Sequence, residues 1–166
     1  AIRYTGIYTA LTAPTNITTE ANGGYAGAAS VGGTTLSYQV STAGKVVQFD
    51  FAFNLDSIAS RTVLLNSLKK IEFNEKVANS STVTRNAKQK LYVWNQNQNV
   101  WDHEVIKTDE TVGGYMKVTV ESDFSQYVDA NNNIRFALLS YDPADANPTR
   151  VESDHVFLTI DYLSIG

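Results

Sequence analysis

The chain has 166 residues and no cysteine, and its 13 basic and 17 acidic residues give a formal net charge of −4. This length suits one domain with a core of its own, so we expect residues 1–166 to form a single domain. The lack of cysteine excludes disulfides and thiolate sites, the acidic balance argues against a nucleic-acid partner, and no apolar run is long enough for a membrane span.

Apolar and polar residues alternate along most of the chain, as in strands with one face turned to a core. The first two alternating runs are 36–40 and 47–53, and we expect them to pair as a hairpin. The three phenylalanines of the second run share one face, while Gln48, Asp50 and Asn54 share the other. This pattern predicts an antiparallel strand that is buried on one face only.

Strands dominate the rest of the chain, and helix is scarce. Further strands are predicted at 69–77, at two runs within 89–106, and at 115–121, 133–141 and 155–165. The segment 57–68 could hold one or two helical turns, and 123–128 one more, with Asp123 as its cap. Long loops are expected at 14–33 and 142–154. About eight strands in a chain of this length predict an all-β fold, a two-sheet antiparallel β-sandwich of jelly-roll type.

Both tryptophans of the chain fall within 89–106, on either side of an amide-rich turn. Aromatic rings beside amides suit sugar recognition, because a pyranose offers an apolar face and a rim of hydroxyls. If Leu91 and Val93 face inward, Tyr92 and Trp94 face outward. If residues 95 and 100 pair across the turn, Trp94 lies opposite Trp101 and both share one environment, which could be a binding surface or the core.

The strand 133–141 carries a second candidate group. Arg135 lies opposite the apolar set of this strand, and Tyr141 ends it. A guanidinium can bind vicinal hydroxyls or a uronate while a ring stacks on the sugar, although Arg and Tyr are also an ordinary surface pair. The following loop adds polar groups, among them Asp142 and Arg150.

The order of several short motifs resembles the galactose-binding-like jelly-roll modules that are appended to bacterial extracellular glycan-active enzymes and surface proteins. The motifs are Tyr92-Val93-Trp94-Asn95, Val100-Trp101, the Asp-Phe-x-x-Tyr-Val turn at 123–128, Ile134-Arg135-Phe136 and the closing run 158–165. The resemblance covers residues 36–166 and implies a non-catalytic, carbohydrate-binding accessory domain. It also implies that Trp101 packs in or beside the core.

The same resemblance implies a structural calcium ion in some members, held by an acidic residue of the last strand and groups near the N-terminus. In this sequence these would be Asp161 and Glu20. The acidic loop 142–154 also offers the oxygen ligands that calcium prefers, but its spacing does not match an EF-hand.

Neither of the two histidines, His103 and His155, lies in a zinc-ligand spacing or beside a nucleophile motif. A glycosidase-like carboxylate pair could assemble from distant positions, but no strand-lined cleft identifies one. The sequence therefore predicts that the chain is not an enzyme.

The resulting expectation is a carbohydrate-binding module of a secreted or cell-surface bacterial protein, binding a polysaccharide or oligosaccharide, with no nucleic-acid or membrane partner. It would be linked to a catalytic or surface-anchoring domain. The expected ligand contacts are Trp94, Tyr92, Tyr141, Arg135, Asn97, Asp142 and Arg150. The alternative is a structural or adhesive β-sandwich domain without glycan binding, because fold alone does not decide function.

Overall fold

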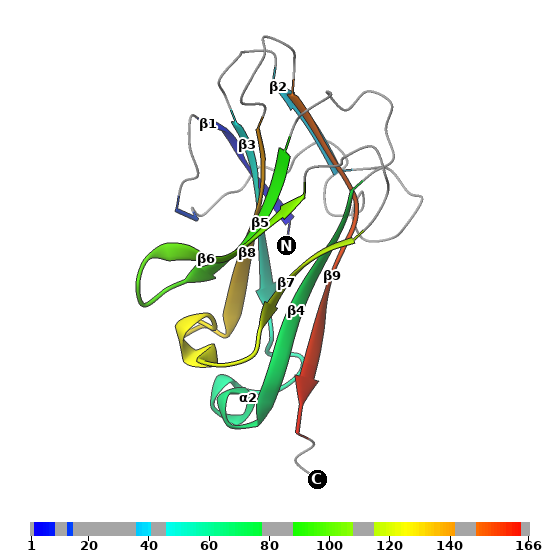
Figure 1. The fold of residues 1–166 in the computed structure, drawn as a ribbon. Helices are drawn as coiled ribbons and strands as arrows, with labels where there is room; N and C mark the ends of the chain where they lie inside the picture. Colours follow the sequence, from blue (N-terminus) through cyan, green and yellow to red (C-terminus); the bar gives the residue numbers. More distant parts are fainter. Residues whose placement is uncertain are drawn as a thin grey trace.

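The computed structural model describes residues 2–8, 13–14, 36–40, 46–77, 88–107, 115–141 and 149–163, which form two antiparallel sheets (Figure 1). The five-stranded sheet contains, in spatial order, β1 (Ile2–Tyr8), β3 (Val46–Asn54), β8 (Asn133–Tyr141), β5 (Lys88–Asn95) and β6 (Val100–Lys107). The four-stranded sheet contains β2 (Leu36–Val40), β9 (Thr149–Tyr162), β4 (Leu68–Val77) and β7 (Tyr115–Val120).

The strand orders β3-β8-β5-β6 and β2-β9-β4-β7 interleave in sequence between the two sheets. Most consecutive strands therefore belong to opposite sheets, and β5 and β6 are the one consecutive pair among the described strands that lie side by side. This is the arrangement of a jelly roll, in which antiparallel strands fold into two facing sheets. The predicted all-β, two-sheet jelly-roll fold is confirmed.

The predicted hairpin between the first two alternating runs is wrong. Strand β2 pairs with β9, whereas β3 lies in the other sheet between β1 and β8. Alternation marks a strand but does not choose its partner, and in a jelly roll most partners are distant in sequence. Strand β1 was not expected, because Gly6 interrupts its pattern at the point where its register with β3 shifts.

Strand β3 is buried on both faces from Gln48 to Phe51, whereas Asn54 at its end is exposed. Phe49 and Phe51 are fully buried in the core, and Gln48 and Asp50 on the opposite face are 0% and 5% exposed. Gln48 Nε2 donates a hydrogen bond of 2.8 Å to Asp50 Oδ1. The expectation of a strand buried on one face only is therefore wrong, since the outward face of this sheet is also covered here.

The core lies between the sheets, at the positions that alternation predicted. Phe73 of β4 stacks on Phe136 of β8 with ring centroids 4.5 Å apart and planes 11° apart. Phe51 of β3 meets Phe73 at 5.3 Å. The inward residues of β7, which are Met116, Val118 and Val120, are buried as expected. Aromatic contacts across the sandwich thus fix the separation and register of the two sheets.

Helix is scarce, as the sequence predicts. The helix α2 (Arg61–Ser67) begins after Ser60, whose hydroxyl accepts a 3.4 Å hydrogen bond from the Val63 amide. The 3₁₀ turn η1 (Phe124–Gln126) follows Asp123, which has φ 54° and makes no capping hydrogen bond with its side chain, so the predicted cap is wrong. No helix in the described ranges is long and apolar enough to cross a membrane.

Candidate functional site

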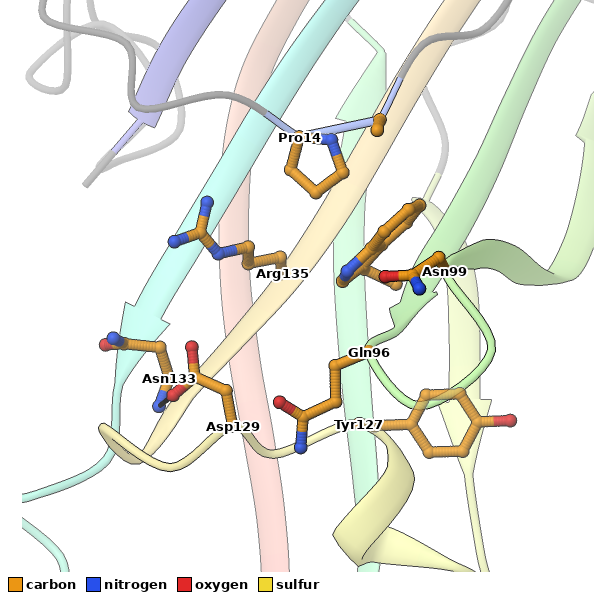
Figure 2. A pocket seen from close by; sticks show the side chains of 9 residues that line it. Pro14, Gln96, Asn99, Tyr127, Asp129, Asn133 and Arg135 are labelled. Carbon is orange, nitrogen blue, oxygen red and sulfur yellow. Dashed lines mark hydrogen bonds between the residues drawn. The ribbon is translucent and has the colours of Figure 1, made fainter.

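An open cavity of about 450 Å³ lies on the outward face of the five-stranded sheet, near the end where β8 begins and β5 ends (Figure 2). Its described lining residues are Ala13, Pro14, Trp94, Gln96, Asn99, Tyr127, Asp129, Asn133 and Arg135. They come from two strands, from the β5–β6 turn, from the segment after η1 and from the distant pair 13–14. The site therefore exists only in the folded chain.

Strand register places Trp94 and Arg135 on the same side of the sheet. Val93 pairs with Phe136, and both are fully buried in the core. The next residue of β5, Trp94, and the preceding residue of β8, Arg135, turn to the opposite face, because successive side chains in a strand alternate. Both side chains are half-buried and line the cavity.

The two tryptophans face each other. Asn95 pairs with Val100 and Trp94 with Trp101, so the predicted cross-strand pairing is the one that forms. The indole centroids are 5.0 Å apart with planes at 65°. Trp101 is half-buried and does not belong to the hydrophobic core of the described residues, so it does not pack in the core, and packing beside the core stays a prediction.

Asn95 holds the β5–β6 turn in place. Its Oδ1 accepts hydrogen bonds of 3.1 Å from the backbone amides of Asn97 and Gln98, as in an Asx turn. Its Nδ2 donates to Asp102 Oδ2 at 2.9 Å and to Gln126 Oε1 at 2.8 Å. Asn95 is 1% exposed, so these bonds form away from solvent and fix the turn that carries Gln96 and Asn99.

Gln96 is oriented by η1 and by Val128, which follows it. Its Nε2 donates to the carbonyl oxygens of Ser125 at 3.0 Å and Val128 at 2.8 Å. Its backbone amide donates to the Gln126 carbonyl at 2.9 Å. The Gln96 Oε1 atom accepts no hydrogen bond from the described residues, so it is available as an acceptor at the cavity.

Asp129 and Asn133 line the side of the cavity that lies across from Asn99 (Figure 2). Asp129 Oδ1 accepts hydrogen bonds of 2.9 Å from the backbone amides of Asn131 and Asn133. Asn133 Oδ1 accepts one of 3.0 Å from Asn54 Nδ2. Among the described residues, Asp129 Oδ2 and Asn133 Nδ2 have no hydrogen-bond partner. The hydrogen bonds of the other side-chain atoms therefore hold Asp129 Oδ2 in place as an acceptor and Asn133 Nδ2 in place as a donor.

Tyr127 contributes its ring but directs its hydroxyl away from the other labelled side chains (Figure 2). The hydroxyl donates to Asp102 Oδ2 at 3.0 Å and lies 3.0 Å from His103 Nε2. Because its single proton goes to Asp102, His103 Nε2 acts as the donor to the tyrosine oxygen. Burial, then the hydrogen bond to Asp102, raises the Tyr127 pKa above its ordinary value.

Of the predicted contacts, the cavity brings together Trp94 and Arg135. Tyr92 faces outward by register but is buried, and its hydroxyl donates a 2.6 Å hydrogen bond to Glu104 Oε2. Tyr92 thus has the predicted outward direction, but its side chain is buried and lies outside the described lining of the cavity. Asn97 is exposed in the turn but does not line the cavity.

The remaining predicted contacts lie elsewhere or outside the described residues. Tyr141 ends β8, six positions beyond Arg135, which corresponds to about 20 Å along a strand. The structure does not describe the Tyr141 side chain. Arg150 belongs to β9 in the other sheet, where it pairs with Gln39, so part of the predicted loop 142–154 is strand. Asp142 and Glu20 lie outside the described residues. A contact between Tyr141 and the ligand therefore stays a prediction.

The predicted metal ligand Asp161 is exposed on β9 and forms an ion pair of 3.5 Å with Lys70. Among the described residues, no group of three histidine or acidic side chains could hold a metal ion. Calcium binding by Asp161 and Glu20 stays a prediction, because Glu20 lies outside the described residues.

Sequence reasoning missed most of the polar lining. Gln96 and Asn99 belong to the amide-rich turn that the sequence singled out, but the residue chosen there was Asn97. The contribution of Asp129, Asn133 and Pro14 depends on segments that only the fold brings together. Residue type identified the turn, but it did not say which amides face the cavity.

Models of protein families give no match to this chain. Curated proteins give no match to it either. Among solved structures, the fold is similar to TmCBM61 in complex with β-1,4-galactotriose, with 10% identity, a TM-score of 0.43 and coverage of 76% of this chain and 70% of that chain. It is also similar to a mutant of Xylanase10C from Cellvibrio japonicus in complex with xylopentaose, with 14% identity and a TM-score of 0.40. That likeness covers 76% of this chain and 23% of the xylanase chain. These likenesses concern the fold, and no ligand of this chain follows from them.

Proposed function

We propose that the protein is a non-catalytic carbohydrate-binding domain that holds a pyranose of an oligosaccharide or polysaccharide at Trp94 and Arg135. The observation that carries this proposal is the combination of groups in one cavity. A half-buried indole lies beside donors and acceptors that have no hydrogen-bond partner among the described residues. The cavity volume of about 450 Å³ falls within the range of about 300–1,000 Å³ that is usual for small-molecule sites.

A pyranose has an apolar face and a rim of hydroxyls that match the aromatic and polar groups of the cavity. Its apolar face stacks on the Trp94 ring, because burying carbon–hydrogen surface against an aromatic ring is favourable. Its hydroxyls donate to Asp129 Oδ2 and Gln96 Oε1, and accept from Asn133 Nδ2 and the Arg135 guanidinium. The hydrogen bonds of Asn95, Gln96 and Asp129 hold the polar groups in place before the sugar arrives, which lowers the entropic cost of binding.

The site is better suited to binding than to hydrolysis. Glycoside hydrolysis normally uses two carboxylates that flank the scissile bond. Among the described lining residues Asp129 is the one carboxylate, and its Oδ1 is held by two backbone amides. We therefore assign the cavity no catalytic role.

In the parent protein this domain would be secreted or attached to a bacterial cell surface, and linked to a catalytic or anchoring domain. Such tethering raises the effective concentration of the linked domain near its substrate. A structural calcium ion involving Asp161 and Glu20 belongs to the same proposal.

Tryptophan fluorescence tests the proposal directly, because both tryptophans of the chain belong to the pair at the cavity. Titration with plant, microbial and host polysaccharides should give a saturable change with one glycan class. Trp94→Ala should abolish the binding measured by calorimetry. Tyr162→Ala is the matched control, because Tyr162 is 49% exposed and does not line this cavity. Absence of binding by the folded protein across the panel would favour the structural or adhesive alternative.

A further inference from the structure

Arg135 differs from the other half-buried cations of the described chain. Arg61 donates to the Val128 carbonyl at 3.1 Å, Lys70 pairs with Asp161 and Lys90 with Glu104, and Lys76 also has an interaction. The Arg135 guanidinium makes no hydrogen bond or ion pair with any described residue. A charge that is partly removed from water without a partner is costly. The cavity thus contains a half-buried cation that has no partner among the described residues.

We propose that the sugar held in this cavity carries a carboxylate, as a uronic acid does, and that Arg135 binds this carboxylate. The inference rests on the proposed function and names its ligand class. A guanidinium presents parallel N–H groups that match the two oxygens of a carboxylate, and such charge-assisted pairs are about twice as strong as neutral hydrogen bonds. A neutral hexose would offer Arg135 hydroxyls alone.

The one carboxylate of the described lining does not neutralise Arg135. Asp129 makes no ion pair with it, and Asp129 Oδ1 already accepts two backbone hydrogen bonds. Figure 2 shows the Arg135 side chain extending away from Gln96. The cavity therefore contains a cation with no ion-pair partner among the described residues, together with acceptors that suit sugar hydroxyls.

Oligosaccharides of galacturonate, mannuronate and glucuronate, each compared with its own methyl ester, test the inference by calorimetry. The ester keeps the stereochemistry and removes only the charge. One acid should bind about tenfold more tightly than its ester, or more, as expected for charge-assisted hydrogen bonds. Added salt should reduce this difference, because the cavity is open to solvent.

Substitutions test whether the Arg135 side chain causes the preference for the acid over its ester. Arg135→Gln should remove the preference for the acid, and Arg135→Lys should restore part of it by charge without the planar fork. Lys69→Gln is the matched control, because it removes an exposed cation that does not line the cavity and should leave both affinities within about twofold of the original.

The outcomes separate the two proposals. Equal affinity for acid and ester, or preference for a neutral glycan, would overturn the carboxylate assignment and leave sugar binding intact. Equally tight binding of a sulfated galactan would also overturn it, because the site would then recognise anions in general. Failure of the folded protein to bind any glycan would overturn both proposals.

Discussion

Trp94 lies directly opposite Trp101 in the β5–β6 ladder, and the two rings meet edge to face with centroids 5.0 Å apart. Trp94 lines the cavity, whereas Trp101 is absent from its described lining. Trp101 therefore supports the ring that we expect to touch the sugar. A T-shaped aromatic contact of this kind contributes about 0.5–1.5 kcal/mol beyond the area it buries.

Replacing Trp101 by Ala should weaken glycan binding by about two- to tenfold, because Trp94 loses the ring that restricts its orientation. Trp94→Ala should instead abolish detectable binding. Calorimetry with the glycan identified by fluorescence measures both effects. Unchanged affinity in Trp101→Ala would show that the Trp94 ring is held by other contacts.

Asn95→Ala should lower the free energy of unfolding by about 2–3 kcal/mol, because four hydrogen bonds of a side chain that is 1% exposed are lost. Urea denaturation measures the change. Asn97→Ala is the control, since Asn97 is exposed in the same turn and its replacement should change the stability by less than about 0.5 kcal/mol. Equal effects of the two substitutions would contradict the role assigned to Asn95.

Tyr92→Phe should raise the pKa of Glu104. The hydrogen bond from Tyr92, followed by Lys90, holds this pKa below its ordinary value of 4.5. A depressed carboxylate pKa stabilises the fold fully above the unfolded pKa, and the contribution disappears as the pH falls through the folded pKa. The variant should therefore lose less stability than the original chain when acidified below about pH 4.5. Carboxyl NMR titration gives the pKa, and an unshifted Glu104 resonance would contradict the prediction.

Tyr127 should ionise at a higher pH than an ordinary tyrosine, because burial and then Asp102 raise its pKa. A raised pKa favours the neutral phenol in the fold. Its contribution is fully present below the unfolded pKa of about 10 and is lost as the pH rises through the folded pKa. Tyrosine absorbance in an alkaline titration tests this, with Tyr127→Phe identifying the late component. Loss of an early component instead would contradict the assignment.

Phe73→Ala should destabilise the protein by about 3–5 kcal/mol, because it removes a fully buried ring that stacks on Phe136 across the sandwich. Phe157→Ala offers a comparison, since Phe157 is only half-buried and meets the exposed Tyr115. Its effect on denaturant midpoints should be clearly smaller. Similar losses for both substitutions would argue that the core is not centred on Phe73.

The amino-acid sequence by itself determined which residues of several strands face the core. Met116, Val118 and Val120, and likewise Ile134, Phe136 and Leu138, are buried as their alternation predicts. Side-chain direction in a strand is local, because it depends only on the period of two along the backbone. A short polar turn between the two strands within 89–106 was also predictable from residue type, but the pairing of Asn95 with Val100 was one open alternative that the structure decided.

Only the tertiary structure decided strand partners and solvent exposure. β2 pairs with β9 instead of β3, and the outward residues Gln48 and Asp50 are buried. The cavity depends on the same kind of information, because Trp94, Asp129 and Arg135 come from three separate segments of the chain. Alternation cannot encode which distant segments meet, since many pairings bury the same apolar faces and the packing of the whole chain selects one of them.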